Sequence, residues 1–241
     1  PIGVIGAEGA NELAAAADVV VAVGTRLGDF ATGSWSVFGD DRLTIIGVNA
    51  ARFDAGKHLA LPVVGDARES LAELAAGLDD WRCDESWTAR GPAAAARLWA
   101  YLDDIGAVDD PPDVPTYAQV VAAVNATATA DDYALTSSGG FPGELNNGWR
   151  SRGVATFDCE YGFSCMGYEI SGGWGAAMAR TAGEVFVFVG DGSYLMLNSD
   201  LYSAVLHGHK MIVIVCDNGG FAVIERLQLA QGGASFNNML A

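Results

Sequence analysis

An acidic residue and a carboxamide each follow an apolar run in the second half of this 241-residue sequence. Asp191 comes directly after Val185–Gly190, and Asn218 follows the run Met211–Cys216. Short apolar runs of this kind predict buried parallel strands, and strands of such a sheet open their carboxyl ends onto a shared crevice. A carboxylate and an amide oxygen that converge there could hold a small hard cation such as Mg²⁺, bridging to a phosphate group.

Small residues surround both of these oxygen donors. Gly190 and Gly192 flank the acidic residue and let the backbone approach a phosphate without side-chain obstruction, and Ser193 can donate a hydrogen bond to it. After the carboxamide, a glycine pair lets the chain turn so that the Gly220 carbonyl faces the cation. The alternative is an ordinary strand–turn–helix, because an isolated GDG occurs in many loops.

The elements that must position these residues predict an α/β fold, with two doubly wound parallel-sheet units. Apolar runs predict strands at 18–24, 43–48, 61–64, 133–136, 185–189 and 211–216. Helical periodicity, small-residue content and capping residues predict helices at 11–17, 67–78, 93–102, 117–126, 167–180 and 198–206. In the last of these, Asn198 is the expected N-cap.

Changes in composition divide the chain into three parts. Residues 1–78 form the first α/β unit, and residues 116–241 form the second. Residues 79–115 predict a linker with one helix, because the DDPPDVP run at 109–115 is rich in proline, which disrupts regular structure. The chain starts without methionine and stops without a closing element, so we expect a fragment of a longer protein.

The composition restricts the possible partners. With a net charge of -17, the surface should repel nucleic acid and anionic membranes, so a phosphate must bind through backbone amides and a metal. No run reaches the roughly 18 apolar residues of a membrane span. The four cysteines lack CxxC spacing, which favours reduced thiols in a cytoplasmic protein.

The order of strand, GDGS, helix, strand and DN with glycines resembles the thiamine diphosphate (ThDP) binding motif. The resemblance extends to residues 160–169, the segment beneath the cofactor's aminopyrimidine, where Met166 would wedge the cofactor into a bent shape and the Ser164 carbonyl would accept a hydrogen bond. By the same comparison, Gly140, Phe141 and Pro142 form a second loop that contacts the diphosphate. Core packing for the methionine and a plain loop at 140–142 are the alternatives.

The family that this resemblance indicates is the ThDP enzymes of the acetolactate synthase type. Residues 24–30 and 43–49 resemble the second half of its central domain. A narrower likeness, to the trihydroxycyclohexane-1,2-dione hydrolases of myo-inositol catabolism, lies in FPGEL (141–145), EYGFSCMGYEISG (160–172), GDGSYLMLNSDL (190–201) and DNGGF (217–221). It implies a hydrolase dependent on ThDP and Mg²⁺ that opens a cyclic dione with water, giving 5-deoxyglucuronate.

The family also implies what this chain does not contain. Its activating glutamate belongs to an N-terminal domain and is supplied across a subunit interface, so a homodimer or homotetramer with a shared site is expected. Glu160 and Glu169 are not equivalents of that residue by position. The catalytic residue is therefore unknown, and we expect the chain alone to be inactive.

Departures from the family pattern leave other functions open. Ala222 stands where glycine is usual, and Val223–Gln228 replaces a polar stretch on the substrate side. An acetolactate-synthase-like carboligase or 2-oxo acid decarboxylase is the alternative enzyme, although FPGEL differs from its usual turn. A non-catalytic nucleotide-binding module and an interaction scaffold are the non-enzyme alternatives, the first weakened by the absence of GxGxxG at Gly24–Asp29.

Overall fold

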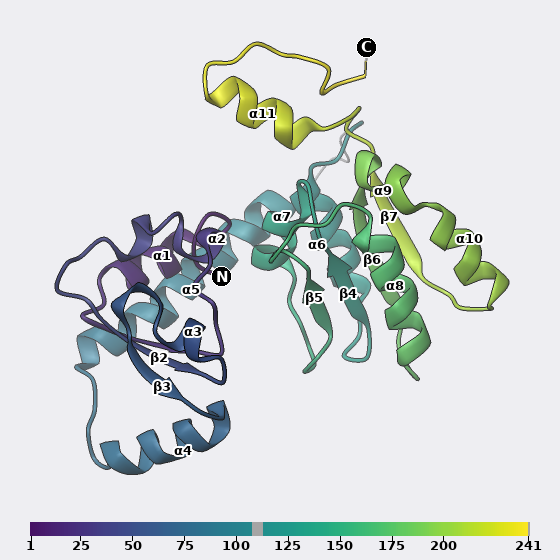
Figure 1. Ribbon diagram of the computed structural model, residues 1–241. Helices are drawn as coiled ribbons and strands as arrows, with labels where there is room; N and C mark the ends of the chain where they lie inside the picture. The colour runs from purple at the N-terminus through teal and green to yellow at the C-terminus, as the bar shows by residue number, and fades with distance from the viewer. Residues whose placement is uncertain (108–112, 241) are drawn as a thin grey trace. The chain divides into compact units, whose positions relative to one another are not determined.

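The computed structural model describes residues 1–107 and 113–240, which form two compact units (Figure 1). The units are Pro1–Tyr101 and Leu102–Ala241. Each contains a parallel sheet with helices packed on it, so the predicted α/β class is confirmed. The predicted proline-rich run at 109–115 lies partly outside the described residues, and residues 113–115 have no regular structure.

The first unit is built on three parallel strands in the order β1-β2-β3. Its strands are β1 (Val19–Val23), β2 (Thr44–Asn49) and β3 (Leu61–Val64). Its helices are α1 (Glu8–Ala15), α2 (Asp29–Thr32), η1 (Ser36–Phe38), α3 (Arg52–Ala55), η2 (Lys57–Leu59), α4 (Ala67–Leu78) and most of α5 (Glu85–Gly106). These strands follow chain order, so the reversal of a doubly wound sheet does not occur among them.

The core of the first unit lies between β1, β2 and the segments that follow them. Its buried apolar residues are Ala22, Leu27, Val37, Phe38, Ile45 and Ala60. Helix α4 begins where the Asp66 side chain accepts hydrogen bonds from two backbone N–H groups, as an N-cap should. Its predicted apolar face, Leu71, Leu74 and Leu78, is exposed to solvent in this chain.

The second unit has four parallel strands in the order β5-β4-β6-β7. They are β4 (Tyr133–Thr136), β5 (Phe157–Cys159), β6 (Val185–Gly190) and β7 (Ile212–Cys216). Its helices are α6 (Tyr117–Thr127), α7 (Phe141–Gly148), α8 (Tyr168–Ala179), α9 (Asp191–Leu197), α10 (Ser199–Leu206) and α11 (Ala222–Ala230). Strand β5 lies on one side of β4, whereas β6 and β7 lie on the other side. The direction of winding therefore reverses between β4 and β6.

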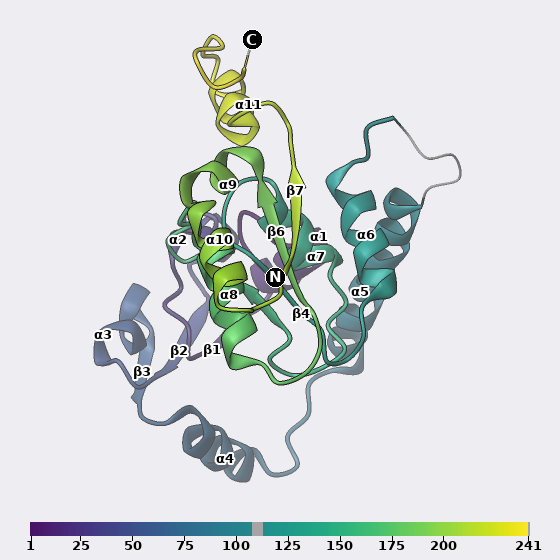
Figure 2. The same cartoon turned by 90° about the vertical axis from the view of Figure 1, so that its right-hand side faces the viewer.

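Both faces of this second sheet are covered (Figure 2). Helices α8 and α10 lie on one side, over a core of Leu135, Ile170, Val185, Val187 and Val189. Helices α6 and α7 lie on the other side, over a core that includes Phe141, Leu145, Phe186 and Phe188. Alternate residues of β6 point to opposite cores, which explains why its whole apolar run is buried.

The structure corrects three local predictions. The segment predicted as a loop at 140–142 is the start of helix α7, with Pro142 in its first turn, where proline is well tolerated. The single helix expected to begin at Asn198 is preceded by α9, and the Asn198 side chain makes no capping hydrogen bond. Strand β5 was not predicted, because three residues are too short to give a clear pattern.

No helix of the described residues combines the length and the apolar character needed to cross a bilayer.

Helix α8 provides a test of the packing on β6. A Cβ atom at Gly173 would lie 2.4 Å from Val187 Cγ2 and 3.1 Å from Met211 Sδ. We therefore expect Gly173→Ala to destabilise the full-length protein by about 1–3 kcal/mol, because overpacking outweighs the gain in helix propensity. Gly175→Ala, two positions along the same helix with nothing within 4 Å, should be neutral or stabilising. Equal melting temperatures for the two variants would contradict this account.

Candidate metal and phosphate site

The two oxygen donors, Asp191 and Asn218, follow neighbouring strands. Strands β6 and β7 pair in parallel, and Gly190 is opposite Cys216 at the end of the ladder. Asp191 is the next residue after Gly190, and Asn218 lies two residues beyond Cys216. Both side chains therefore leave the sheet at its carboxyl edge, beside the point between β4 and β6 where the winding reverses.

Each donor presents a buried oxygen that has no hydrogen-bond partner. Both Asp191 Oδ1 and Asn218 Oδ1 are inaccessible to solvent and unpartnered. The side-chain nitrogen of Asn218 donates to the Tyr117 hydroxyl at 2.6 Å, so the side-chain oxygen is the atom that has no hydrogen-bond partner. A buried acceptor without a donor is unfavourable by about 1–3 kcal/mol, and a bound cation removes that penalty. The donor set therefore fits a hard cation.

The protein supplies only part of a coordination shell. Among the described residues, no group of three or more His, Cys, Asp or Glu side chains could hold a metal ion. One carboxylate oxygen, one amide oxygen and a backbone carbonyl suit a Mg²⁺ ion that takes its remaining ligands from water and phosphate. The predicted carbonyl belongs to Gly220, which has φ 138° and lies in a turn held by Phe221 N–H donating to the Asn238 carbonyl.

The glycines around Asp191 have different surroundings. Gly190 precedes helix α9, and a Cβ atom there would meet nothing within 4 Å, so its backbone is open to approach. A Cβ atom at Gly192 would lie 2.6 Å from the Phe221 ring. The missing side chain of Gly192 thus makes room for this ring, which ties the start of α9 to the turn after Asn218. A contact of either glycine with phosphate remains a prediction.

The segment 140–142 offers its backbone rather than its side chains. Phe141 is 1% exposed, and its ring packs edge-on against those of Tyr117 and Phe188, with centroids 4.7 and 5.3 Å away. Pro142 is also fully buried. A diphosphate at this end of the sheet can therefore meet only main-chain groups near Gly140, where the Tyr117 ring fills the space that a Cβ would take.

Tyr117 is a site residue that the sequence analysis missed. Its hydroxyl accepts from Asn218, and its ring contacts both Gly140 and Phe141. It therefore links the loop after β4 with the end of β7. In the sequence it resembles an ordinary first residue of a helix, so only its place beside the sheet edge could have identified it.

Glu160 holds the loop that carries Ser164 and Met166. Its carboxylate accepts from the backbone N–H groups of Phe163 and Cys165, both at 3.0 Å, and from the hydroxyl of Ser137. The hydrogen bond from the Cys165 amide is the largest cause that lowers the pKa of Glu160 below its usual 4.5. The backbone of this loop is therefore held by hydrogen bonds to one carboxylate.

Within this loop, the two predicted cofactor residues stand out in conformation and exposure. Ser164 has φ 52°, in the left-handed region that residues other than glycine rarely adopt. Met166 is 37% exposed, which is more than expected of a methionine packed in a core. Both features are compatible with contact to a ligand, although that role stays a prediction.

Glu169 is the second residue that the sequence analysis missed. It lies in the first turn of α8, is fully buried, and accepts from Ser138, Gly167 and Ser193. The Ser193 hydroxyl, predicted to face a phosphate, instead donates to Glu169 at 2.7 Å. A single charged residue in a helix rich in small residues was the signal that could have drawn attention to it.

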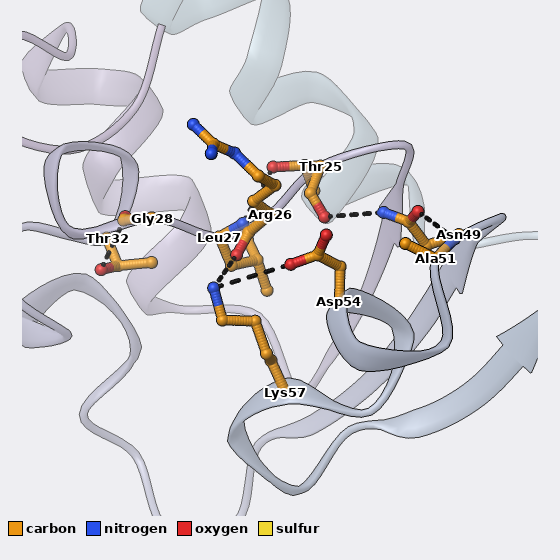
Figure 3. Close-up of polar contacts among 9 residues, drawn as sticks. All are labelled: Thr25, Arg26, Leu27, Gly28, Thr32, Asn49, Ala51, Asp54 and Lys57. Carbon is orange, nitrogen blue, oxygen red and sulfur yellow. Dashed lines mark hydrogen bonds and ion pairs between the residues drawn. The ribbon is translucent and has the colours of Figure 1, made fainter. Parts of the chain in front are cut away.

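The corresponding edge of the first sheet is closed by its own side chains (Figure 3). Asn49 donates to the Thr25 carbonyl at 3.1 Å, and Lys57 donates to the Arg26 carbonyl at 2.8 Å while lying 3.8 Å from Asp54. The Lys57 ammonium group therefore already has protein partners, a carbonyl and a carboxylate, and does not need an anionic ligand. This arrangement gives no support to a separate nucleotide site at the Gly24–Asp29 turn.

Comparison with known proteins shows two family matches along the chain. Residues 138–240 match the model described as "Thiamine pyrophosphate enzyme, C-terminal TPP binding domain", and residues 1–74 match "Thiamine pyrophosphate enzyme, central domain". The first match contains Asp191, Asn218 and the loop of Met166.

Similar curated proteins share one name. The chain is 35% identical to a 3D-(3,5/4)-trihydroxycyclohexane-1,2-dione hydrolase of Shouchella clausii, over 98% of this chain and 40% of that protein. It is 36% identical to 3D-(3,5/4)-trihydroxycyclohexane-1,2-dione hydrolase 2 of a Bacillus cereus strain, with the same coverage. The chain thus spans about 40% of the length of these relatives.

The Glu160 loop should respond to pH. Because the pKa of Glu160 is lowered in the folded protein, its stabilisation of the loop is complete above pH 4.5 and is lost as pH falls through the lowered pKa. Amide hydrogen exchange of a 160–167 peptide, corrected for the intrinsic rate at each pH, should therefore show protection at pH 7 that declines below pH 4.

The same measurement on Glu160→Gln should show weak protection at both pH values. Glu73→Gln, an exposed position on α4, is the matched control and should behave like the wild type. Protection in the wild type that is independent of pH would overturn the role given to this carboxylate.

Proposed function

The chain belongs to the thiamine pyrophosphate enzymes, and from that premise we propose that it is part of a Mg²⁺-dependent C–C bond hydrolase. Its substrate is trihydroxycyclohexane-1,2-dione, whose ring it opens with water to give 5-deoxyglucuronate. The observation that carries the proposal is the pair of unpartnered buried oxygens, Asp191 Oδ1 and Asn218 Oδ1, at neighbouring strand ends. The names of the similar proteins support the choice of substrate.

Bound ThDP supplies an electron sink for the charge left when a carbon–carbon bond beside a carbonyl breaks. The residues of this chain bind and orient it. Asp191 and Asn218 hold the cation, and main-chain groups near Gly140 and Gly190 receive the diphosphate. Met166 would support the bound cofactor, and the Ser164 carbonyl would orient its aminopyrimidine. The proton-activating glutamate belongs to another part of the full-length protein.

The active protein is a cytoplasmic homodimer or homotetramer whose subunits share the site. Four cysteines without a disulfide are in keeping with a reducing compartment. Helices α9 and α10 also expose large apolar side chains, which suit burial against a second copy of the protein. The most exposed of these are Leu195, Tyr202, Val205 and Leu206.

Substitution of the two oxygen donors tests the metal site. In the full-length protein, Asp191→Ala and Asn218→Ala should each weaken Mg²⁺-dependent ThDP binding by at least roughly 100-fold, because each removes a ligand. Isothermal titration with ThDP at fixed Mg²⁺ would measure this loss. Without metal, Asp191→Ala should melt at the same temperature as the wild type or above it, since its Oδ1 has no partner to lose.

Asp217→Asn is the matched control for charge. Asp217 is adjacent to Asn218, but it is exposed, and among the described residues its side chain accepts a hydrogen bond only from the Gly219 N–H, a contact that Asn retains. This variant should bind ThDP as the wild type does. Unchanged ThDP affinity in Asp191→Ala, or an equal loss in Asp217→Asn, would count against the assignment.

Turnover separates the proposed reaction from its alternative. The full-length protein with ThDP and Mg²⁺ should convert trihydroxycyclohexane-1,2-dione to 5-deoxyglucuronate, and the activity should elute at the mass of a dimer or tetramer. It should not release CO₂ or form acetolactate from pyruvate. Pyruvate turnover without ring opening would favour the carboligase or decarboxylase, and an active monomer would refute the shared site.

A further inference from the structure

Glu169 is a buried carboxylate surrounded by hydrogen-bond donors. Its side chain is 0% exposed. Oε1 accepts from the backbone N–H and the hydroxyl of Ser138, at 2.9 and 3.2 Å, while Oε2 accepts from Gly167 N–H at 3.1 Å and the Ser193 hydroxyl at 2.7 Å. Three neighbouring residues thus supply four donor groups, which matches the acceptor-only capacity of a charged carboxylate.

No ion pair among the described residues includes Glu169. A buried charge without a counter-charge is tolerated only when hydrogen bonds and local dipoles replace water. The four donors and the N-terminus of helix α8 meet this requirement. An apolar side chain would fill the same space without such an arrangement, so packing alone does not explain a glutamate here.

The donors to Glu169 come from three segments that are distant in the sequence. Ser138 directly precedes the glycines after β4, Gly167 follows Met166, and Ser193 lies two residues beyond Asp191. In the proposed function these segments contact the diphosphate, the aminopyrimidine side and the cation. Gly167 N–H also donates to the Ser193 hydroxyl at 2.7 Å, which joins two of the segments directly.

We propose that Glu169 is a positioning residue that sets these three segments relative to one another, so that both ends of ThDP meet preformed contacts. The inference rests on the proposed function. It requires no contact between Glu169 and the cofactor, because the carboxylate acts through Ser138, Gly167 and Ser193. A residue that serves only packing would be replaceable by a side chain of the same shape.

Glu169→Gln in the full-length protein tests this role, because glutamine keeps the shape but replaces one oxygen with an NH₂ donor. That donor must face either the Ser138 N–H or the Gly167 N–H, so one of these two N–H groups loses its hydrogen bond to residue 169. In the protein without cofactor, hydrogen exchange should rise in peptides covering 138–140, 166–167 and 191–193. With cofactor, the Kd for ThDP should rise about 10- to 100-fold and kcat at saturating ThDP should fall, with KM for the substrate unchanged.

Ser171→Ala is the matched control on the same helix. Its hydroxyl donates to Asp200 at 2.5 Å, a part-buried contact between α8 and α10 outside the proposed site. This variant should lower the melting temperature without changing the Kd for ThDP or the exchange of the three segments. If Glu169→Gln instead behaves like Ser171→Ala, with a lower melting temperature only, Glu169 is structural and the proposal is overturned.

The outcomes also distinguish this inference from the proposed function. Failure of the wild type to bind ThDP would refute the function, while hydrogen exchange would still decide whether Glu169 joins the segments. If Glu169→Gln does not fold, Ser138→Ala replaces it, since it removes one hydroxyl donor and leaves the carboxylate in place. Increased exchange at 138–140 and 191–193 in that variant supports the proposal, and unchanged exchange overturns it.

Discussion

The pairing of β6 with β7 is the constraint on which the site depends. Because Gly190 is opposite Cys216, the residues just beyond each strand share the same end of the sheet. The fold then buries one oxygen of Asp191 and one of Asn218 without giving either a protein donor. Native proteins seldom leave buried polar atoms unpartnered, and each one calls for an explanation. One cation at this end of the sheet accounts for both atoms together.

Two glutamates arrange the chain around this edge in different ways. Glu160 shapes its own loop, through the N–H groups of Phe163 and Cys165. Glu169 joins segments that are far apart in the sequence, through Ser138 and Ser193. A carboxylate suits both tasks because it accepts several hydrogen bonds at once, which lets one side chain fix several backbone positions. The loop of Met166 is therefore held from both ends, by one glutamate before it and one after it.

Most of the strands, and the convergence of Asp191 and Asn218, were predictable from sequence because they depend on local pattern and chain order. The runs at 133–136, 185–189 and 211–216 are apolar enough to be strands of a parallel sheet, and successive strands joined by a helix commonly lie side by side. This pattern alone predicts that Asp191 and Asn218 lie at one end of the sheet, and the pairing of β6 with β7 places them there.

The features that escaped prediction depend on contacts between distant residues. The sequence around Phe141 indicates a loop, but this residue is the first of helix α7, and its ring packs between those of Tyr117 and Phe188. The space beside Gly192 is taken by the Phe221 ring, a pairing that the local sequence does not indicate. No periodicity within one segment encodes such pairs, since each partner comes from a different part of the chain.

The charge of the protein gives the proposed cation a second role. With a formal net charge of -17, the chain as a whole repels a diphosphate, and Asp191 adds a negative charge where the diphosphate would bind. Backbone N–H groups near Gly140 and Gly190 are dipoles, and they do not neutralise a full anionic charge. A divalent cation held by Asp191 and Asn218 would offset this repulsion. Metal and cofactor should therefore bind cooperatively, each completing a site that is electrostatically unfavourable for the other alone.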